Sequence, residues 1–108
     1  MLYTKEQVLN GIASYLDDEV MSKLPTHGKW IMGTAIALSR DNISEILNNP
    51  YIKMLGIVNA DGLWDVDKLA SALKATAERY GNIQLDLPII GRLTFSAEDV
   101  DLMRRHIN

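Results

Sequence analysis

The spacing of the apolar residues changes at Gly56, and this change constrains the fold more than any other feature of the sequence. Before Gly56 they recur every third or fourth position, as in Val8, Ile12, Leu16 and Val20, which is typical of amphipathic helices. After Gly56, short stretches alternate apolar and polar residues, as half-buried strands do. The pattern predicts an α+β fold: an N-terminal helical pair packed with a small, mainly antiparallel sheet of two hairpins and two further helices.

Two long helices and one short helix are expected in the first half. The first follows Thr4, which is an N-cap residue with Gln7 as its capping-box partner, and ends near Leu24 because Pro25 disfavours a helical residue before it. The second runs from about residue 28 to Leu47. Residues 39–42 mark a kink or a break in it, because Ser, Asp and Asn side chains compete for backbone hydrogen bonds. A short helix over residues 51–55 ends at the glycine.

In the second half, the sequence predicts the same order of elements twice: a strand, a glycine-bearing turn, a strand and a capped helix. The first unit has a hairpin over residues 57–64, with Gly62 in its turn, and a helix over 66–80 capped by Asp65. The second unit has strands over 83–87 and 92–95 and a last helix capped by Ser96 with Asp99. This similarity is either a structural duplication or a common way to build a small α+β layer.

Composition predicts one domain, 1–108, with a formal net charge of −3. The cations are scattered along the chain, so nucleic-acid binding is not expected. The absence of cysteine excludes disulfides, thiol nucleophiles, zinc fingers and iron–sulfur clusters. Apolar runs are too short for a signal peptide or a membrane span, so we expect a soluble protein of the cytoplasm, with no membrane partner.

No set of residues with catalytic, cofactor-binding or metal-ligating spacing is found, so we do not expect an enzyme. A calcium loop around Gly62 fails, because Ile57 and Lys68 would occupy its first and twelfth positions. His27 and His106 have no second ligand at helical spacing and are expected to be structural or surface residues. Acidic pairs lie where they cap helices. No cofactor and no small-molecule ligand is implied.

The sequence does offer candidate surface for a protein partner or for self-association. Gly33 and Ala37 have the spacing that lets two helices approach closely, within one chain or between two. The large apolar side chains of Trp30, Ile31 and Trp64 are candidates for the same interface, with the core of the domain as the alternative.

Several short motifs resemble those of a group of small uncharacterised proteins from phages and prophages of Gram-positive bacteria. The resemblance covers about residues 7–107 and implies a phage-encoded accessory or structural role, with no established activity, catalytic residue or cofactor. It is carried by Leu24-Pro25, Gly33-Thr34-Ala35-Ile36-Ala37, Met54-Leu55-Gly56-Ile57, Asp61-Gly62, Asp65-Val66-Asp67-Lys68-Leu69, Ile90-Gly91-Arg92-Leu93-Thr94-Phe95 and Glu98-Asp99-Val100-Asp101.

We therefore expect a non-enzymatic interaction or assembly protein, plausibly an accessory or structural component encoded by a phage or prophage. A small DNA-binding regulator is the alternative, because helices followed by a strand pair have the order of a winged helix. Arg92 in a hairpin and the adjacent Arg104 and Arg105 would then supply charge. The acidic balance of the chain argues against this alternative.

Overall fold

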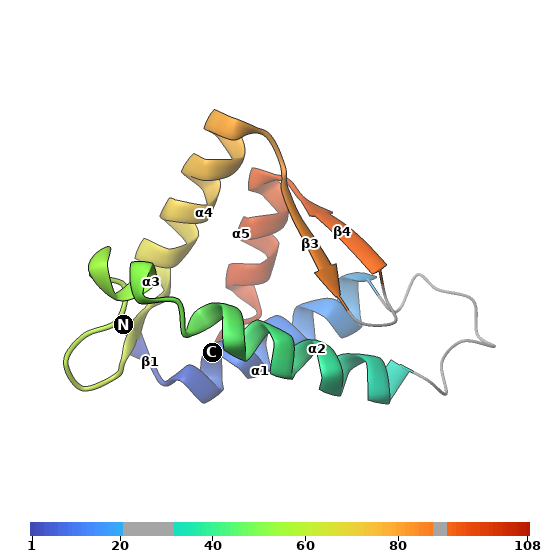
Figure 1. Ribbon diagram of the computed structural model, residues 1–108, viewed down its shortest axis with the longest axis horizontal. Helices are drawn as coiled ribbons and strands as arrows, with labels where there is room; N and C mark the ends of the chain where they lie inside the picture. Colours follow the sequence, from blue (N-terminus) through green and yellow to red (C-terminus); the bar gives the residue numbers. More distant parts are fainter. Residues whose placement is uncertain (21–31, 88–90) are drawn as a thin grey trace.

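Helices and short antiparallel strands make up the computed structural model, which describes residues 1–20, 32–87 and 91–108 (Figure 1). Over these residues it has five α-helices, a π-helical turn η1 and two separate two-stranded antiparallel sheets, which confirms the α+β prediction. The elements are β1 (Leu2–Tyr3), α1 (Lys5–Tyr15), η1 (Leu16–Val20), α2 (Met32–Leu47), α3 (Pro50–Met54), β2 (Trp64–Asp65), α4 (Val66–Tyr80), β3 (Ile83–Leu87), β4 (Gly91–Phe95) and α5 (Ala97–Arg105).

The start of α1 is the predicted capping box. The backbone N–H of Gln7 donates to Thr4 Oγ1 at 3.1 Å, and the Thr4 N–H donates to Gln7 Oε1 at 2.9 Å. Because both groups satisfy donors that a helix start leaves free, they fix where α1 begins. The helix continues directly into η1, which was not expected. The predicted end near Leu24 lies outside the described residues.

The helix α2 is continuous, so of the predicted kink or break over residues 39–42 the break is wrong. The side chains of Arg40 and Asn42 bind other elements and do not compete for the backbone of α2. Arg40 donates from Nη1 to Asn10 Oδ1 at 2.6 Å and also pairs with Glu6, both on α1. Asn42 donates to the Asp86 carbonyl of β3 at 3.4 Å. The predicted start of the helix near residue 28 lies outside the described residues.

The two predicted hairpins form, but they belong to different sheets. In the first, an antiparallel bridge joins Val58 to Trp64 around a turn in which Gly62 takes a φ of +77°. The second arm of this hairpin contains β2. The strand β1 pairs with β2, with Tyr3 opposite Trp64, and β1 was not predicted. The second hairpin pairs β3 with β4 in a register that places Leu85 opposite Leu93.

The helices of the second half begin at their predicted caps. Asp65 Oδ1 accepts from the Lys68 N–H at 3.1 Å at the start of α4. Ser96 and Asp99 form a capping box at the start of α5. Since α4 and α5 are each short and amphipathic, they are held in place by packing against each other, along much of their length (Figure 1).

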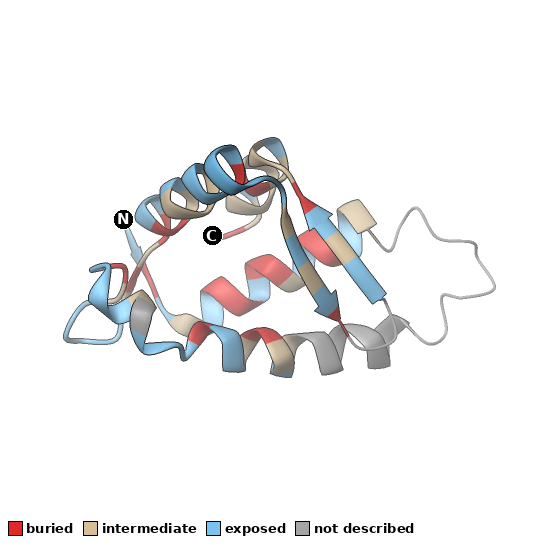
Figure 2. Ribbon diagram, turned by 45° about the horizontal axis from the view of Figure 1, so that its top comes forward, coloured by how far each residue is buried: buried red, intermediate tan, exposed pale blue. Residues whose placement is uncertain are grey.

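The core lies between the pair α1 and α2 on one side and α4 with α5 on the other, and the β3–β4 hairpin closes one end (Figure 1). Figure 2 shows the buried residues along the helix faces that point toward the middle of the molecule. Val8, Leu16 and Val66 are almost fully buried. None of the helices in the described part of the chain is long and apolar enough to cross a membrane.

Candidate functional site

An apolar pocket of about 190 Å³ lies between the two helical layers. We call it the central pocket. Side chains of every α-helix and of both strands of the β3–β4 hairpin reach it, so it exists only in the folded chain. Protein interiors are packed about as closely as organic crystals and leave few voids larger than a water molecule. A space of this size is therefore a distinct feature of the molecule.

The central pocket has a deeply buried floor and a partly open mouth. Leu16, Val66 and Val100 on its floor are each at most 3% exposed. At its edge, Ile46 of α2 remains 43% exposed, and Leu73 of α4 is half-buried. The surface that faces the space is almost entirely carbon. A molecule inside it would contact apolar side chains on most sides.

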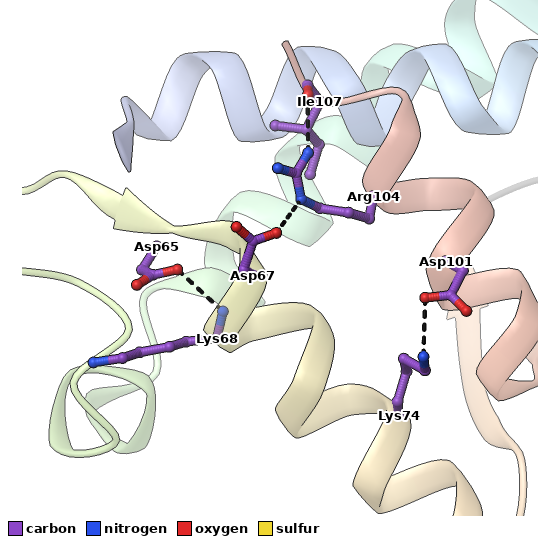
Figure 3. A network of polar contacts seen from close by, with 7 residues as sticks. All are labelled: Asp65, Asp67, Lys68, Lys74, Asp101, Arg104 and Ile107. Carbon is purple, nitrogen blue, oxygen red and sulfur yellow. Dashed lines mark hydrogen bonds and ion pairs between the residues drawn. The ribbon is translucent and has the colours of Figure 1, made fainter. Parts of the chain in front are cut away.

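Among the residues that the structure describes, Arg104 is the one charged residue that lines the central pocket, and its guanidinium binds groups outside it (Figure 3). Nε donates to Asp67 Oδ1 at 2.9 Å, and Nη1 donates to the Ile107 carbonyl at 3.3 Å. The guanidinium also lies over the Tyr3 ring, 5.5 Å from its centre. The hydrogen bond to Asp67 raises the pKa of Arg104 above its ordinary value. The side chain is thus permanently charged and links α5 to α4 and to the N-terminal segment. It offers the pocket only its apolar stem.

A second feature is an exposed apolar surface where β1 and α3 meet. Met1 is 89% exposed, Leu2 45%, Met54 79% and Leu55 48%. Met1 and Leu55 line the same open hollow of about 460 Å³, together with the buried Ile57. We call these four exposed side chains and the hollow the N-terminal surface. Figure 1 places α3 beside the N-terminus.

The rim of the N-terminal surface carries both signs of charge. Asp65, Asp67 and Lys68 line the same hollow. Figure 3 shows the Lys68 ammonium extended away from both carboxylates, while its backbone N–H binds Asp65. No ion pair of this ammonium is found within the described residues. The rim therefore has an anionic part and a cation that is not neutralised by it.

Of the residues that the sequence singled out for an interface, the structure describes the surroundings of Trp64 alone. Trp64 is 3% exposed and belongs to the core, which was the alternative for the large aromatic residues. Gly33 and Ala37 lie on α2. Trp30 and Ile31 lie outside the described residues, so an interface through α2 stays a prediction.

His106 packs against η1 and the end of α1. Its Nδ1 lies 3.2 Å from Ser14 Oγ and 3.6 Å from Asp18 Oδ2, and its ring meets that of Tyr15 edge-on at 5.8 Å. No cluster of three or more His, Asp or Glu residues able to hold a metal ion is found in residues 1–20, 32–87 and 91–108. His27 lies outside these ranges.

Four cations of the described residues are paired with carboxylates, which lowers the positive charge they present to a phosphate. The pairs are Arg40–Glu6, Lys74–Asp101, Arg92–Asp86 and Arg104–Asp67. The Arg92 pair includes the hairpin arginine on which the DNA-binding alternative rests. The hydrogen bond from Arg92 lowers the pKa of Asp86, so the Asp86 carboxylate stays charged beside the arginine.

Comparison with protein families, with curated proteins and with solved structures found no match to this chain.

Sequence reasoning did not identify either feature. The central pocket has no sequence signal, because its lining comes from eight segments whose distances only the fold sets. The N-terminal surface had a weak signal: Met54 and Leu55 are adjacent apolar residues at the end of a short helix, directly before a glycine turn. Two such residues in a row cannot both face a core from so short a helix.

Proposed function

We propose that this chain is a non-enzymatic interaction protein that associates with a second copy of itself through the N-terminal surface. Its role would be the accessory or structural one that the resemblance to phage and prophage proteins implies. One observation carries the proposal: four of the six large exposed apolar side chains in the described residues belong to the two segments that line one hollow. Gathered apolar side chains with a polar rim are typical of protein interfaces.

The charges of the rim favour a second copy as the partner. A two-fold interface brings the same patch of both chains together, so each group of one chain meets a different group of the other. Lys68 of one copy would then face Asp65 of the other, and the reverse, since Asp67 is already paired with Arg104. A patch with both signs is self-complementary in this way. The edge strand β1, paired only with β2 among the described strands, lies at the same place.

Solution mass measured by light scattering over a range of protein concentrations tests the proposal. We expect the mass to rise from that of one chain, 12.1 kDa, toward twice that value. Met54→Lys puts a charge on the N-terminal surface at a side chain that is 79% exposed, so the fold tolerates it. This variant is expected to keep the mass of one chain at concentrations where the natural chain pairs.

The matched control is Tyr80→Lys. Tyr80 is 77% exposed at the far end of α4, so the control removes a similar amount of exposed apolar surface and adds the same charge elsewhere. It should pair as the natural chain does. A natural chain that stays at 12.1 kDa throughout, or a Met54→Lys chain that pairs as well as the control, would show that the proposal is wrong.

A further inference from the structure

We infer that the central pocket is a binding site for a small neutral apolar molecule. This inference concerns a different part of the molecule from the proposed self-association and does not depend on it. It rests on the volume of the pocket, on the chemistry of its wall and on the partners of the one charged residue that lines it.

The volume sets the size of the ligand. An apolar cavity of about 150 Å³ is known to stay free of water and to bind benzene. The central pocket, at about 190 Å³, has room for a ring with one or two extra carbons. We therefore expect a compact ligand of about seven or eight carbon atoms. Its extent is too small for the face of a partner helix.

The wall sets the charge of the ligand. Buried polar groups need hydrogen-bond partners, and buried charges need a partner of opposite sign. The wall offers almost no polar surface. The guanidinium of Arg104 already binds Asp67 and the Ile107 carbonyl and lies over Tyr3. A carboxylate in the pocket would lose its water and meet almost no polar surface, so a neutral ligand is favoured over an acid of the same shape.

Access is provided at the edge between α2 and α4. Ile46 is 43% exposed there, and Ala70 and Leu73 on the facing helix are only partly buried. A small ligand can therefore enter by side-chain movement alone, while Leu16 and Val66 keep the floor closed.

Nuclear magnetic resonance of chains with labelled isoleucine methyl groups tests the inference. The probe is toluene, and sodium benzoate is its charged counterpart of nearly the same shape. Toluene should shift the methyl signals of Ile52 and Ile83, which line the central pocket on α3 and β3. Ile57, which lines the N-terminal hollow, should not shift. Benzoate should shift none of the three.

A pair of variants on α4 gives the control. Ala70 lines the central pocket, whereas Ala75 is exposed on the same helix. Ala70→Leu fills part of the space and should weaken toluene binding at least about tenfold. Ala75→Leu adds the same group outside the pocket and should leave the binding unchanged. If the spectrum of Ala70→Leu is not that of a folded chain, Ala70→Val, with a smaller addition, should weaken binding in the same direction.

Three results would overturn the inference. They are the absence of toluene shifts at Ile52 and Ile83, equal shifts with benzoate, and unchanged toluene binding after Ala70 is enlarged. Shifts at Ile57 alone would place the ligand in the other hollow and also contradict it. The same titration on Met54→Lys separates the two proposals, because ligand binding should persist there although pairing is lost.

Discussion

At the scale of single residues, Gly11 has the least room for a side chain among the glycines that the structure describes. It lies inside α1, and a Cβ built there would be 2.4 Å from Ile107 Cγ1 and 2.7 Å from Ile107 Cα. A glycine in a helix normally costs about 1 kcal/mol relative to alanine. Here it lets the C-terminal segment pass directly over the helix. The close contact therefore decides whether a substitution at Gly11 stabilises or destabilises the fold.

We predict that Gly11→Ala lowers the free energy of unfolding by about 1–3 kcal/mol, because the backbone of Ile107 has to move. Urea denaturation measures this change. Removing residues 107–108 takes away most of the clash, so in that shorter chain the same substitution should become neutral or stabilising. A destabilisation of equal size in both backgrounds would show that the clash is not its cause.

Tyr15 is a buried phenol whose ionisation is opposed by its surroundings. Burial first, and then the Asp99 and Glu19 carboxylates, raise the pKa of its hydroxyl above the ordinary value of 10.0. As the pH rises past 10.0, the unfolded chain loses this proton before the folded chain does. The contribution of Tyr15 to the free energy of unfolding is therefore fully present below that pH and is progressively lost above it.

We predict that Tyr15→Phe reduces the loss of unfolding free energy as the pH rises above 10.0, because it removes a group whose proton the unfolded chain loses first. Denaturation curves at several pH values measure it. Tyr80→Phe, at a ring that is 77% exposed, is the control and should keep the full dependence. Identical pH profiles for the two variants would contradict the assignment to Tyr15.

At the scale of elements, two ion pairs join α4 to α5, and they differ in their surroundings (Figure 3). Arg104 pairs with Asp67 and has additional contacts to Ile107 and Tyr3, with its side chain 26% exposed. Lys74 pairs with Asp101 at 3.1 Å, with its side chain 37% exposed. Exposed pairs contribute little, whereas a partly buried arginine with several acceptors contributes more.

We predict that Arg104→Met lowers the free energy of unfolding by about 1–2 kcal/mol, since it leaves the Ile107 carbonyl without this donor. Lys74→Met should change it by less than about 0.5 kcal/mol. Methionine keeps most of the apolar stem in both cases, so the difference reports on the charged groups. Thermal or urea unfolding of the two variants measures it, and equal effects would show that the extra contacts of Arg104 contribute nothing.

The elements that could be predicted are those specified by neighbouring residues. The caps at Thr4, Asp65 and Ser96 and the alternation in β3 and β4 are local, so the sequence indicates them directly. The strand β1 was missed because two residues have no period, and it forms only by pairing with β2. The break expected in α2 was wrong for the same reason, since distant partners on α1 and β3 bind Arg40 and Asn42.

At the scale of the whole molecule, neither candidate site could be predicted, because each is a property of the assembled surface. The central pocket depends on how well five helices and a hairpin fill the space between them, which composition and period do not encode. The N-terminal surface brings together the first residues and the end of α3, more than fifty positions apart. The sequence did predict that Asp65 caps α4, whose first turns form part of its rim.

The central pocket also makes a prediction about the response of the whole molecule to pressure. Unfolding under pressure has a negative volume change that scales with the internal void volume that it eliminates. Ala70→Leu fills part of the central pocket, so its volume change should be less negative, by roughly 10–40 mL/mol. Ala75→Leu makes the same substitution at an exposed position of α4 and fills no internal space. Its volume change on unfolding should match that of the natural chain. Pressure denaturation followed by tryptophan fluorescence measures both. Since no ligand is needed, the result tests the void itself: equal volume changes in the two variants would mean that water already fills the pocket.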